Sequence, residues 1–243
     1  MTKLSKKVIT FGCRLNNLES ELIDNQLKQH SIDKNVYIFN TCAVTSEAER
    51  KARQSIRKIK KENPNAKIIV TGCSAQIDPN KWLQMEEVSN VIGNSEKIKK
   101  EFWKNFSLNQ QNELITSDIM SVREDKTDFS GLVNQNSRYF LQIQNGCDHR
   151  CTFCVIPYGR GNSRSVSVNK ILDNVNEALQ NNFKEIVLTG VDLTSWGKEL
   201  LGEEYSLGFL VKKILNEFKT LPRLRVSSID PAEIDYELME VLE

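Results

Sequence analysis

Near the start of the chain, a short apolar run that ends in a small turn residue and a cysteine occurs three times. These runs are VITFGC (8–13), VYIFNTC (36–42) and KIIVTGC (67–73). Short apolar runs rich in β-branched residues are typical of buried strands. The pattern therefore predicts three strands, each followed directly by a cysteine.

Two segments between these runs have the periodicity of helices. Residues 15–30 place leucine and isoleucine at helical spacing, which gives one apolar stripe. Residues 46–63 also suit a helix, with Ser46 as the N-cap, Glu49 three residues later and Pro64 beyond the end. Strand–helix–strand alternation predicts a parallel α/β sheet, in which ligands bind beyond the carboxyl ends of the strands.

The three isolated cysteines fall at these strand ends. A lone cysteine is more often an ordinary buried side chain. Three cysteines at equivalent positions are more than packing alone explains, and we expect them to converge on one metal site.

The second half of the chain repeats the alternation after an interruption. Residues 104–137 are polar and weakly periodic, and we interpret them as a linker, with an extra α/β element at ELITSDIM (113–120) as the alternative. The chain ends at ELMEVLE (237–243), within a further helical pattern, and we interpret it as truncated. The expected strands are 139–146, 185–193 and 223–230, the expected helices are 168–183 and 208–218, and the expected domains are 1–103 and 138–243.

Composition is that of a soluble globular protein. Of the 243 residues, 39% are hydrophobic and 27% are charged, and no apolar run approaches the ~20 residues of a membrane helix. The N-terminus lacks the apolar core of a signal peptide, so we expect a cytoplasmic protein without membrane contact. In a reducing compartment, six cysteines more often serve metal binding or catalysis than disulfides. A net charge of +1 confines any nucleic-acid contact to a local patch.

Three more cysteines lie close together in GCDHRCTFC (146–154), as Cys147, Cys151 and Cys154. Thiolates bind zinc, copper(I) and iron–sulfur clusters. Zinc ribbons and ferredoxins use C-x2-C pairs and four ligands, whereas this segment has C-x3-C-x2-C spacing. His149 is a candidate fourth ligand, but its position two residues from Cys147 is cramped. Three cysteines would leave one iron of a cluster open, as a catalytic centre requires.

The spacing C-x3-C-x-aromatic-C, with Phe153 as the aromatic residue, resembles the signature of the radical S-adenosylmethionine (SAM) superfamily. The resemblance implies a four-iron, four-sulfur (4Fe-4S) cluster on Cys147, Cys151 and Cys154, with SAM on the open iron. This site would lie after the first strand of a partial (β/α)6 barrel.

Other segments resemble the methylthiotransferases within that superfamily. They are FGCRLNNLESE (11–21), NTCAVTSEAERKARQSIRK (40–58), VTGCSAQ (70–76), IPYGRGNSRS (156–165) and LTGVDLTSWG (188–197). In that family, cysteines at the positions of Cys13, Cys42 and Cys73 hold a second 4Fe-4S cluster, so that all six cysteines have a role. The implied fold is α/β, with an N-terminal parallel sheet domain and the first half of the barrel, and without the C-terminal TRAM domain.

The resemblance also implies a reaction. One SAM donates a methyl group to sulfur on the second cluster, and another SAM is cleaved reductively to a 5′-deoxyadenosyl radical. NTCAVT and IQNGCDHRCTFC look most like the subgroup that methylthiolates C2 of N6-threonylcarbamoyladenosine next to the anticodon of tRNA. Subgroups acting on isopentenyladenosine or on a ribosomal-protein aspartate are alternatives. The implied partners are tRNA and an electron donor such as a flavodoxin or ferredoxin, and we expect the truncated chain alone to be inactive.

Several further side chains are candidates for the SAM site, each with a plainer alternative. A strand-end glycine also serves a turn, arginines also serve as solvated loop charges, and a strand-end serine or aspartate also serves as a cap. Guanidinium groups suit both the SAM carboxylate and tRNA phosphate. These candidates are Gly190, Arg160, Arg164, Ser227, Arg225 and Asp192.

The segment ERKARQSIRKIKK (49–61) would form a basic helix face. Most such faces are merely solvated, but a tRNA enzyme would use them for phosphate contacts. For the whole protein, the competing hypotheses are a zinc-binding nucleic-acid module and a two-cluster electron-transfer protein.

Overall fold

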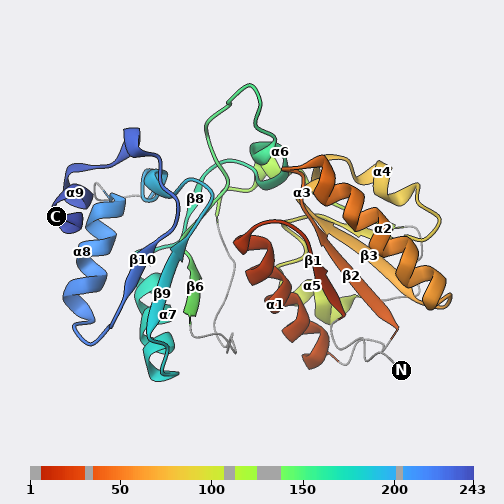
Figure 1. The fold of residues 1–243 in the computed structure, drawn as a ribbon, viewed down its shortest axis with the longest axis horizontal. Helices are drawn as coiled ribbons and strands as arrows, with labels where there is room; N and C mark the ends of the chain where they lie inside the picture. Colours follow the sequence, from red (N-terminus) through yellow and green to blue (C-terminus); the bar gives the residue numbers. More distant parts are fainter. Residues whose placement is uncertain (1–6, 31–34, 107–112, 125–137, 201–204) are drawn as a thin grey trace. The chain divides into compact units, whose positions relative to one another are not determined.

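A computed structural model describes residues 7–30, 35–106, 113–124, 138–200 and 205–243 (Figure 1). The chain divides into two compact units whose segments interleave. The first unit combines residues 1–122 with 149–161, and the second combines 123–148 with 162–243. Residues 149–161, which contain the second and third cysteines of GCDHRCTFC, therefore belong to the N-terminal unit, whereas the sequence-based division was 1–103 and 138–243.

The N-terminal unit is built on a parallel sheet, as predicted, but the sheet has five strands where the sequence indicated three. Its strands run in the order β1-β2-β3-β4-β5, and all four neighbouring pairs are parallel. β5 falls within the segment expected to be a linker, so the alternative element at ELITSDIM is the one observed there. Residues 107–112 and 125–137 of that segment lie outside the described residues. The strands are β1 (Val8–Thr10), β2 (Val36–Thr41), β3 (Lys67–Gly72), β4 (Asn90–Ile92) and β5 (Glu113–Ile115).

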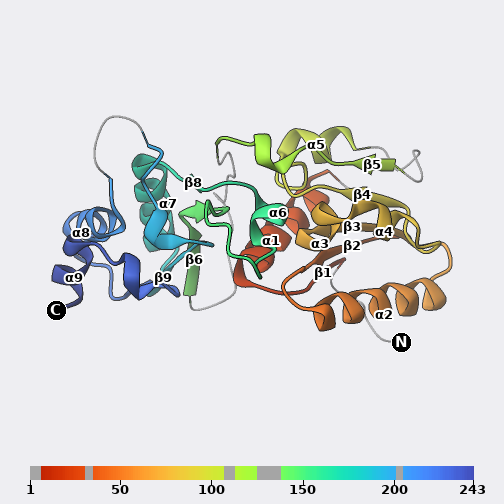
Figure 2. The same cartoon turned by 90° about the horizontal axis from the view of Figure 1, so that it is seen from above.

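Helices cover both faces of this sheet, and the alternation of strand side chains explains why (Figure 2). Ile38 points into a core with α1 and α5, whereas the next residue, Phe39, points into a core with α2 and α4. Both predicted helices are present, but the N-cap of α2 is Thr45 and not the predicted Ser46. The Thr45 side chain accepts the capping hydrogen bond from the amide of Ala48 at 3.2 Å. The helices are α1 (Arg14–Gln29), α2 (Ser46–Glu62), α3 (Cys73–Ile77), α4 (Pro79–Leu83), α5 (Lys100–Asn105) and α6 (Ile156–Arg160), with the 3-10 turn η1 (Ile119–Ser121).

The second unit has three parallel strands in the order β10-β9-β6, as expected for consecutive strands at the start of a barrel. The predicted strand 139–146 is broken at Ile143. The Ile143 amide still donates to Thr189, but its carbonyl accepts from Val166, so the chain leaves β9 there and pairs with β8 instead. The strands are β6 (Arg138–Gln142), β7 (Gln144–Asn145), β8 (Arg164–Ser165), β9 (Glu185–Thr189) and β10 (Leu224–Val226).

Helices of the second unit pack on this sheet around one apolar core, which includes Ile171, Leu188 and Leu210. They are α7 (Val168–Gln180), α8 (Leu207–Glu217) and α9 (Tyr236–Leu242), with the 3-10 turns η2 (Leu193–Ser195) and η3 (Pro231–Glu233). Among the helices that the structure describes, none has the length and apolarity needed to cross a bilayer.

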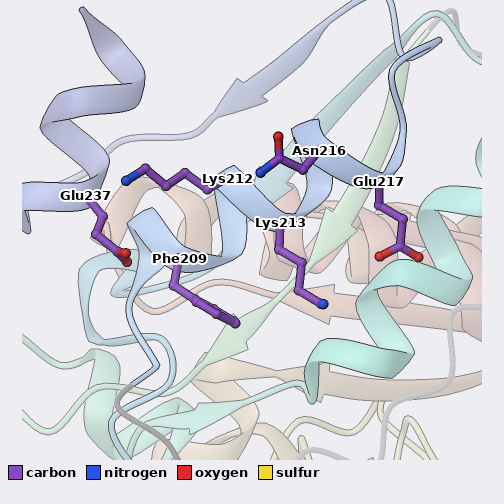
Figure 3. Close-up of a pocket in the computed structure, with 6 residues that line it drawn as sticks. All are labelled: Phe209, Lys212, Lys213, Asn216, Glu217 and Glu237. Atoms are coloured by element: carbon purple, nitrogen blue, oxygen red, sulfur yellow. The ribbon is translucent and has the colours of Figure 1, made fainter.

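A hollow of about 540 Å³ lies beside α8 (Figure 3). Its walls carry charges of both signs, and Lys212 at its edge pairs with Glu240. None of the cysteines lines it, so it is not the site that the sequence predicts. The lining residues are Phe209, Lys212, Lys213, Asn216, Glu217 and Glu237.

Candidate functional site

Three cysteines lie at the carboxyl edge of the N-terminal sheet. Cys13 is the N-cap of α1, Cys42 directly follows β2, and Cys73 is the first residue of α3, directly after β3. Since β1, β2 and β3 are parallel neighbours, their carboxyl ends meet at one edge, which brings the three cysteines together. Cys13 is exposed, whereas Cys42 and Cys73 are buried.

The backbone at this edge is shaped to let the cysteines approach. Gly12 has a φ of 98°, which favours glycine, and a Cβ there would lie 2.6 Å from the sulfur of Cys42. Burial raises the pKa of the Cys42 thiol, and the sulfurs of Cys73 and Cys13 also raise it, while the Val44 amide lowers it. We call the three thiols at this sheet edge, those of Cys13, Cys42 and Cys73, the strand-end cysteine site.

Buried amides hold the strand ends against α1. The side-chain amide of Asn16 donates to the carbonyl of Phe11 at 2.8 Å and to that of Thr41 at 3.0 Å. Asn40 in turn donates to the carbonyl of Asn16 at 2.9 Å. These bonds fix the ends of β1 and β2 relative to the start of α1, and thereby the positions of two of the cysteines.

The short helix α6 packs against the third cysteine. The Asn94 side chain donates to the Gly159 carbonyl at 2.5 Å and to the sulfur of Cys73 at 3.7 Å. A Cβ on Gly159 would lie 2.9 Å from the Cβ of Cys73, so only glycine fits at this approach. The segment after Cys154 therefore forms a wall of the strand-end cysteine site.

Arg160, the last residue of α6, is buried in the N-terminal unit with 4% of its surface exposed. Its guanidinium donates to Glu19 at 2.9 Å and to the side-chain oxygen of Asn16 at 2.6 Å, and it lies 4.0 Å from the sulfur of Cys13. Lys97, which is fully buried, donates to the other carboxylate oxygen of Glu19 at 2.6 Å. The function of Arg160 as a SAM or tRNA ligand stays a prediction, but its protein partners tie it to the strand-end cysteine site.

Burial of the Glu19 carboxylate raises its pKa, but the charges and hydrogen bonds of Arg160 and Lys97 lower it by more. The net result is a pKa of about 2, against an ordinary value of 4.5. Glu19 is therefore ionised at neutral pH and holds two buried cations. The sequence gives little signal for this triad, because Glu19 lies in a segment whose pattern predicts only an ordinary amphipathic helix.

The cysteines of GCDHRCTFC are divided between the two units, with Cys147 in the second and Cys151 and Cys154 in the N-terminal one. In the second unit, Cys147 is half-buried and its sulfur lies 3.6 Å from a carboxylate oxygen of Asp192. In the N-terminal unit, the Cys154 amide donates to the Cys151 carbonyl at 3.0 Å. Phe153 is 89% exposed, and none of the six cysteines forms a disulfide. The thiols of this segment are thus available to a metal group.

Gln144, which was not among the predicted site residues, organises the strand ends of the second unit. Its side-chain oxygen accepts from the amides of Val191 and Asp192, both at 2.9 Å. Its nitrogen donates to the Gly146 carbonyl at 2.8 Å and to the Ser163 hydroxyl at 3.0 Å. Gln144 thus connects the turn after β9 to the residue just before Cys147. The sequence signal that could have identified it is a glutamine at the end of a predicted apolar strand, where the side-chain amide would be buried.

Gly190 lies against Gln144 and does not adopt a positive φ. A Cβ on Gly190 would lie 3.0 Å from the Gln144 side-chain oxygen, so the close approach rather than the turn requires glycine. Its contact with SAM stays a prediction.

The remaining candidates occupy strand ends of the second unit. The Ser227 hydroxyl lies 3.5 Å from that of Thr189, at the carboxyl ends of β10 and β9. Arg225 pairs with Glu185 at 2.7 Å and so engages a protein carboxylate. Arg164 is buried in β8 and donates to the Asn162 carbonyl at 2.8 Å. Their roles in SAM binding also stay predictions.

The basic face of α2 is largely paired with acidic side chains. Arg53 lies 3.2 Å from Glu49 within the helix, and Arg57 lies 3.6 Å from Glu87 outside it. Arg50, Lys51 and Lys58 pair with Glu47 and Glu62 in the same helix. This pairing favours a solvated ion-pair surface over a phosphate-binding face.

Two family models match the two parts of the chain. Residues 6–93 match the uncharacterized protein family UPF0004, and residues 141–240 match the radical SAM superfamily. The first match contains Cys13, Cys42 and Cys73, and the second contains Cys147, Cys151 and Cys154. Each group of three cysteines thus falls within its own matched region of the sequence.

Relatives with curated names extend over nearly the whole chain. A Rickettsia prowazekii protein named threonylcarbamoyladenosine tRNA methylthiotransferase MtaB is 48% identical over 239 residues, covering 98% of this chain and 55% of the relative. A protein of the same name from Aquifex aeolicus is 33% identical, covering 96% of this chain and 58% of the relative. The chain spans about half the length of these relatives.

A solved structure supports the fold. The radical S-adenosylmethionine methyltransferase TsrM from Kitasatospora setae matches 94% of this chain and 50% of its own, with a TM-score of 0.57 and 14% sequence identity. At this identity the match concerns the fold alone. It supports the expected α/β architecture.

Proposed function

We propose that this chain belongs to the radical SAM methylthiotransferase family and is the part of such an enzyme that binds two iron–sulfur clusters. The proposed reaction is transfer of a methylthio group to C2 of N6-threonylcarbamoyladenosine in tRNA. The observation that carries the proposal is the presence of two separate groups of three cysteines, one in each matched domain. Because the chain spans about half of its relatives, the activity is that of a protein of their length.

The segment with Cys147, Cys151 and Cys154 would hold one 4Fe-4S cluster and leave an iron for SAM. Three soft thiols without a disulfide fit such a cluster. When bound, this group supplies the electron that cleaves SAM. The protein's own contribution is to hold the surrounding strand ends in place, through the bonds of Gln144 to the turn at Val191 and Asp192.

The strand-end cysteine site would hold the second cluster. Its three sulfurs gather at one sheet edge. A structural zinc site takes four protein ligands, whereas three cysteines would hold a 4Fe-4S cluster with one iron left open. A set of three cysteines therefore favours a multi-iron cluster over the zinc-binding module.

The proposed substrate and partners follow from the relatives' names and from the chemistry. Both relatives are named for threonylcarbamoyladenosine in tRNA, so tRNA is the proposed substrate and the cytoplasm the proposed location. Reductive cleavage of SAM consumes an electron, so a flavodoxin or ferredoxin is the proposed donor.

Mass analysis of tRNA nucleosides tests the proposal. Cells that lack the full-length gene should lose the 2-methylthio form of N6-threonylcarbamoyladenosine and accumulate the unmodified form, and restoring the gene should reverse this. Loss of the methylthio form of isopentenyladenosine instead would assign the protein to the other tRNA subgroup. Unchanged tRNA nucleosides would contradict the proposal.

A further inference from the structure

Each sulfur of the strand-end cysteine site faces one N–H donor. The Val44 amide donates to Cys42 at 3.4 Å. The Asn94 side chain donates to Cys73 at 3.7 Å, and the Arg160 guanidinium lies 4.0 Å from Cys13, which is the longest of the three contacts. One donor is a backbone group, one is a neutral amide and one is a cation.

The orientation of the Asn94 amide is fixed by its neighbours. Its nitrogen donates to the Gly159 carbonyl, so a flipped amide would set two oxygens against each other at 2.5 Å. The same nitrogen therefore faces Cys73. The Asn94 side-chain oxygen is buried and has no hydrogen-bond partner in the described part of the chain. An unpaired buried acceptor is costly, so packing alone does not explain an asparagine at position 94. The hydrogen bond that its side-chain nitrogen donates to Cys73 does explain it.

The orientation of the Arg160 guanidinium is likewise fixed by hydrogen bonds. Both of its terminal nitrogens donate to acceptors of α1, to Glu19 at 2.9 Å and to Asn16 at 2.6 Å. Arg160 and Lys97 share the single carboxylate of Glu19, so this buried triad carries two positive charges and one negative charge. Buried charge is stable only when it is compensated, and the cysteine that faces Arg160 supplies negative charge once it is a metal-bound thiolate.

We propose that Asn94 and Arg160 are positioning residues of the second cluster, which donate N–H groups to the sulfurs of Cys73 and Cys13 and so raise its reduction potential. The inference rests on the proposed function, because it requires a cluster at this site. Hydrogen bonds to cluster sulfurs are among the main determinants of iron–sulfur potentials. Donors and a nearby cation favour the reduced form, since reduction adds negative charge to the cluster and its ligands.

The placement of these donors links the two cysteine motifs. Arg160 and Gly159 lie in α6, which begins two residues after Cys154. The segment that continues from the radical SAM cysteines thus supplies a donor and a wall to the strand-end cysteine site, both within the N-terminal unit.

A redox titration of the 243-residue chain tests the proposal. Cys147, Cys151 and Cys154 are first replaced by alanine, so that only the strand-end cysteine site can hold a cluster. Asn94→Ala and Arg160→Gln are then compared with this parent after anaerobic reconstitution, with the midpoint potential followed by electron paramagnetic resonance and iron measured per chain. Arg160→Gln leaves Glu19 paired with Lys97, so the buried charges stay balanced. Arg57→Gln, on the surface of α2, is the matched control.

We expect iron to be retained and the midpoint potential to become more negative in both variants, with the double variant lowest. At a fixed applied potential, a tenfold fall in the ratio of reduced to oxidised cluster would correspond to ~59 mV. Arg160→Lys should recover part of the lost potential, and Arg57→Gln should leave the potential unchanged.

Midpoint potentials equal to that of the parent would overturn the inference while leaving the proposed function intact. If Arg160→Gln does not fold, Asn94→Ala alone decides the matter. A parent that binds no iron would instead count against the second cluster itself.

Discussion

The guanidinium of Arg160 lies 2.9 Å from the carboxylate of Glu19, although 141 residues separate them in sequence. Glu19 also holds Lys97 from the loop after β4, and all three side chains are buried. One carboxylate therefore fastens α6, which follows Cys154, to α1, the helix whose N-cap is Cys13. Breaking this contact should affect both stability and the strand-end cysteine site.

Replacing Glu19 by glutamine should destabilise the N-terminal unit strongly. The change keeps the shape of the side chain but leaves Arg160 and Lys97 buried without their shared anion, which typically costs about 3–5 kcal/mol. Urea unfolding of the metal-free chain measures this. A Trp196→Phe background confines tryptophan fluorescence to Trp82 and Trp103, which both lie in the N-terminal unit.

The matched control is Glu47→Gln on the exposed surface of α2, where an ion pair with Arg50 is solvated. Surface pairs contribute about 0–1 kcal/mol. Equal effects of the two glutamine substitutions would show that the buried triad is not stabilising.

Acid should weaken the N-terminal unit through the same carboxylate. The pKa of Glu19 is about 2 in the folded chain, below its ordinary value of 4.5. Its contribution is fully present above pH 4.5 and is lost as the pH falls from 4.5 toward 2. Linkage converts this difference into roughly 3 kcal/mol. The difference in unfolding free energy between the parent and Glu19→Gln should therefore shrink between pH 6 and pH 3, and a constant difference over this range would exclude the linkage.

The sequence could predict the strand-end cysteines because strand, helix and cysteine recur together, and parallel strands must bring their carboxyl ends to one edge. It could not predict that Arg160 belongs to the N-terminal unit, since that depends on a contact with Glu19 far away in the chain. The strand break at Ile143 was missed for a related reason. An unbroken apolar run does not reveal that the chain exchanges one strand partner for another.

Separate substitutions should distinguish the two cysteine groups. Cys147→Ala should abolish reductive SAM cleavage, because it removes a ligand of the proposed SAM-binding cluster. Cys13→Ala should leave SAM cleavage intact and abolish methylthiolation. Both are measured in the full-length protein, as 5′-deoxyadenosine formed and as methylthiolated tRNA nucleoside. Normal methylthiolation by the Cys13 variant would show that the strand-end cysteine site has no role in the reaction.

Gln144→Ala should weaken SAM binding while leaving iron content unchanged. The substitution removes the acceptor for the amides of Val191 and Asp192 and the donor to Gly146, so the turn after β9 and the approach to Cys147 lose their common anchor. We expect about a tenfold loss of affinity, as for 1.4 kcal/mol of binding free energy, measured by equilibrium dialysis of SAM with the reconstituted full-length protein. Asn174→Ala, another buried amide but in the middle of α7, is the control. Equal losses in the two variants would indicate a general packing effect.

Gly159→Ala should loosen α6 from the strand-end cysteine site. The added methyl group would lie 2.9 Å from the Cβ and 3.2 Å from the Cα of Cys73, and the backbone of α3 cannot yield as a flexible side chain would. Overpacking of this kind typically costs about 1–3 kcal/mol, and it would also lengthen the bond from Asn94 to the Gly159 carbonyl. In the Cys147, Cys151 and Cys154 alanine background, the variant should lose iron faster to a chelator than the parent. Ala52→Gly, in the buried face of α2 away from the cysteines, provides a control with a destabilising change elsewhere in the same unit. If both variants lose iron in proportion to their loss of overall stability, α6 is not a wall of the site.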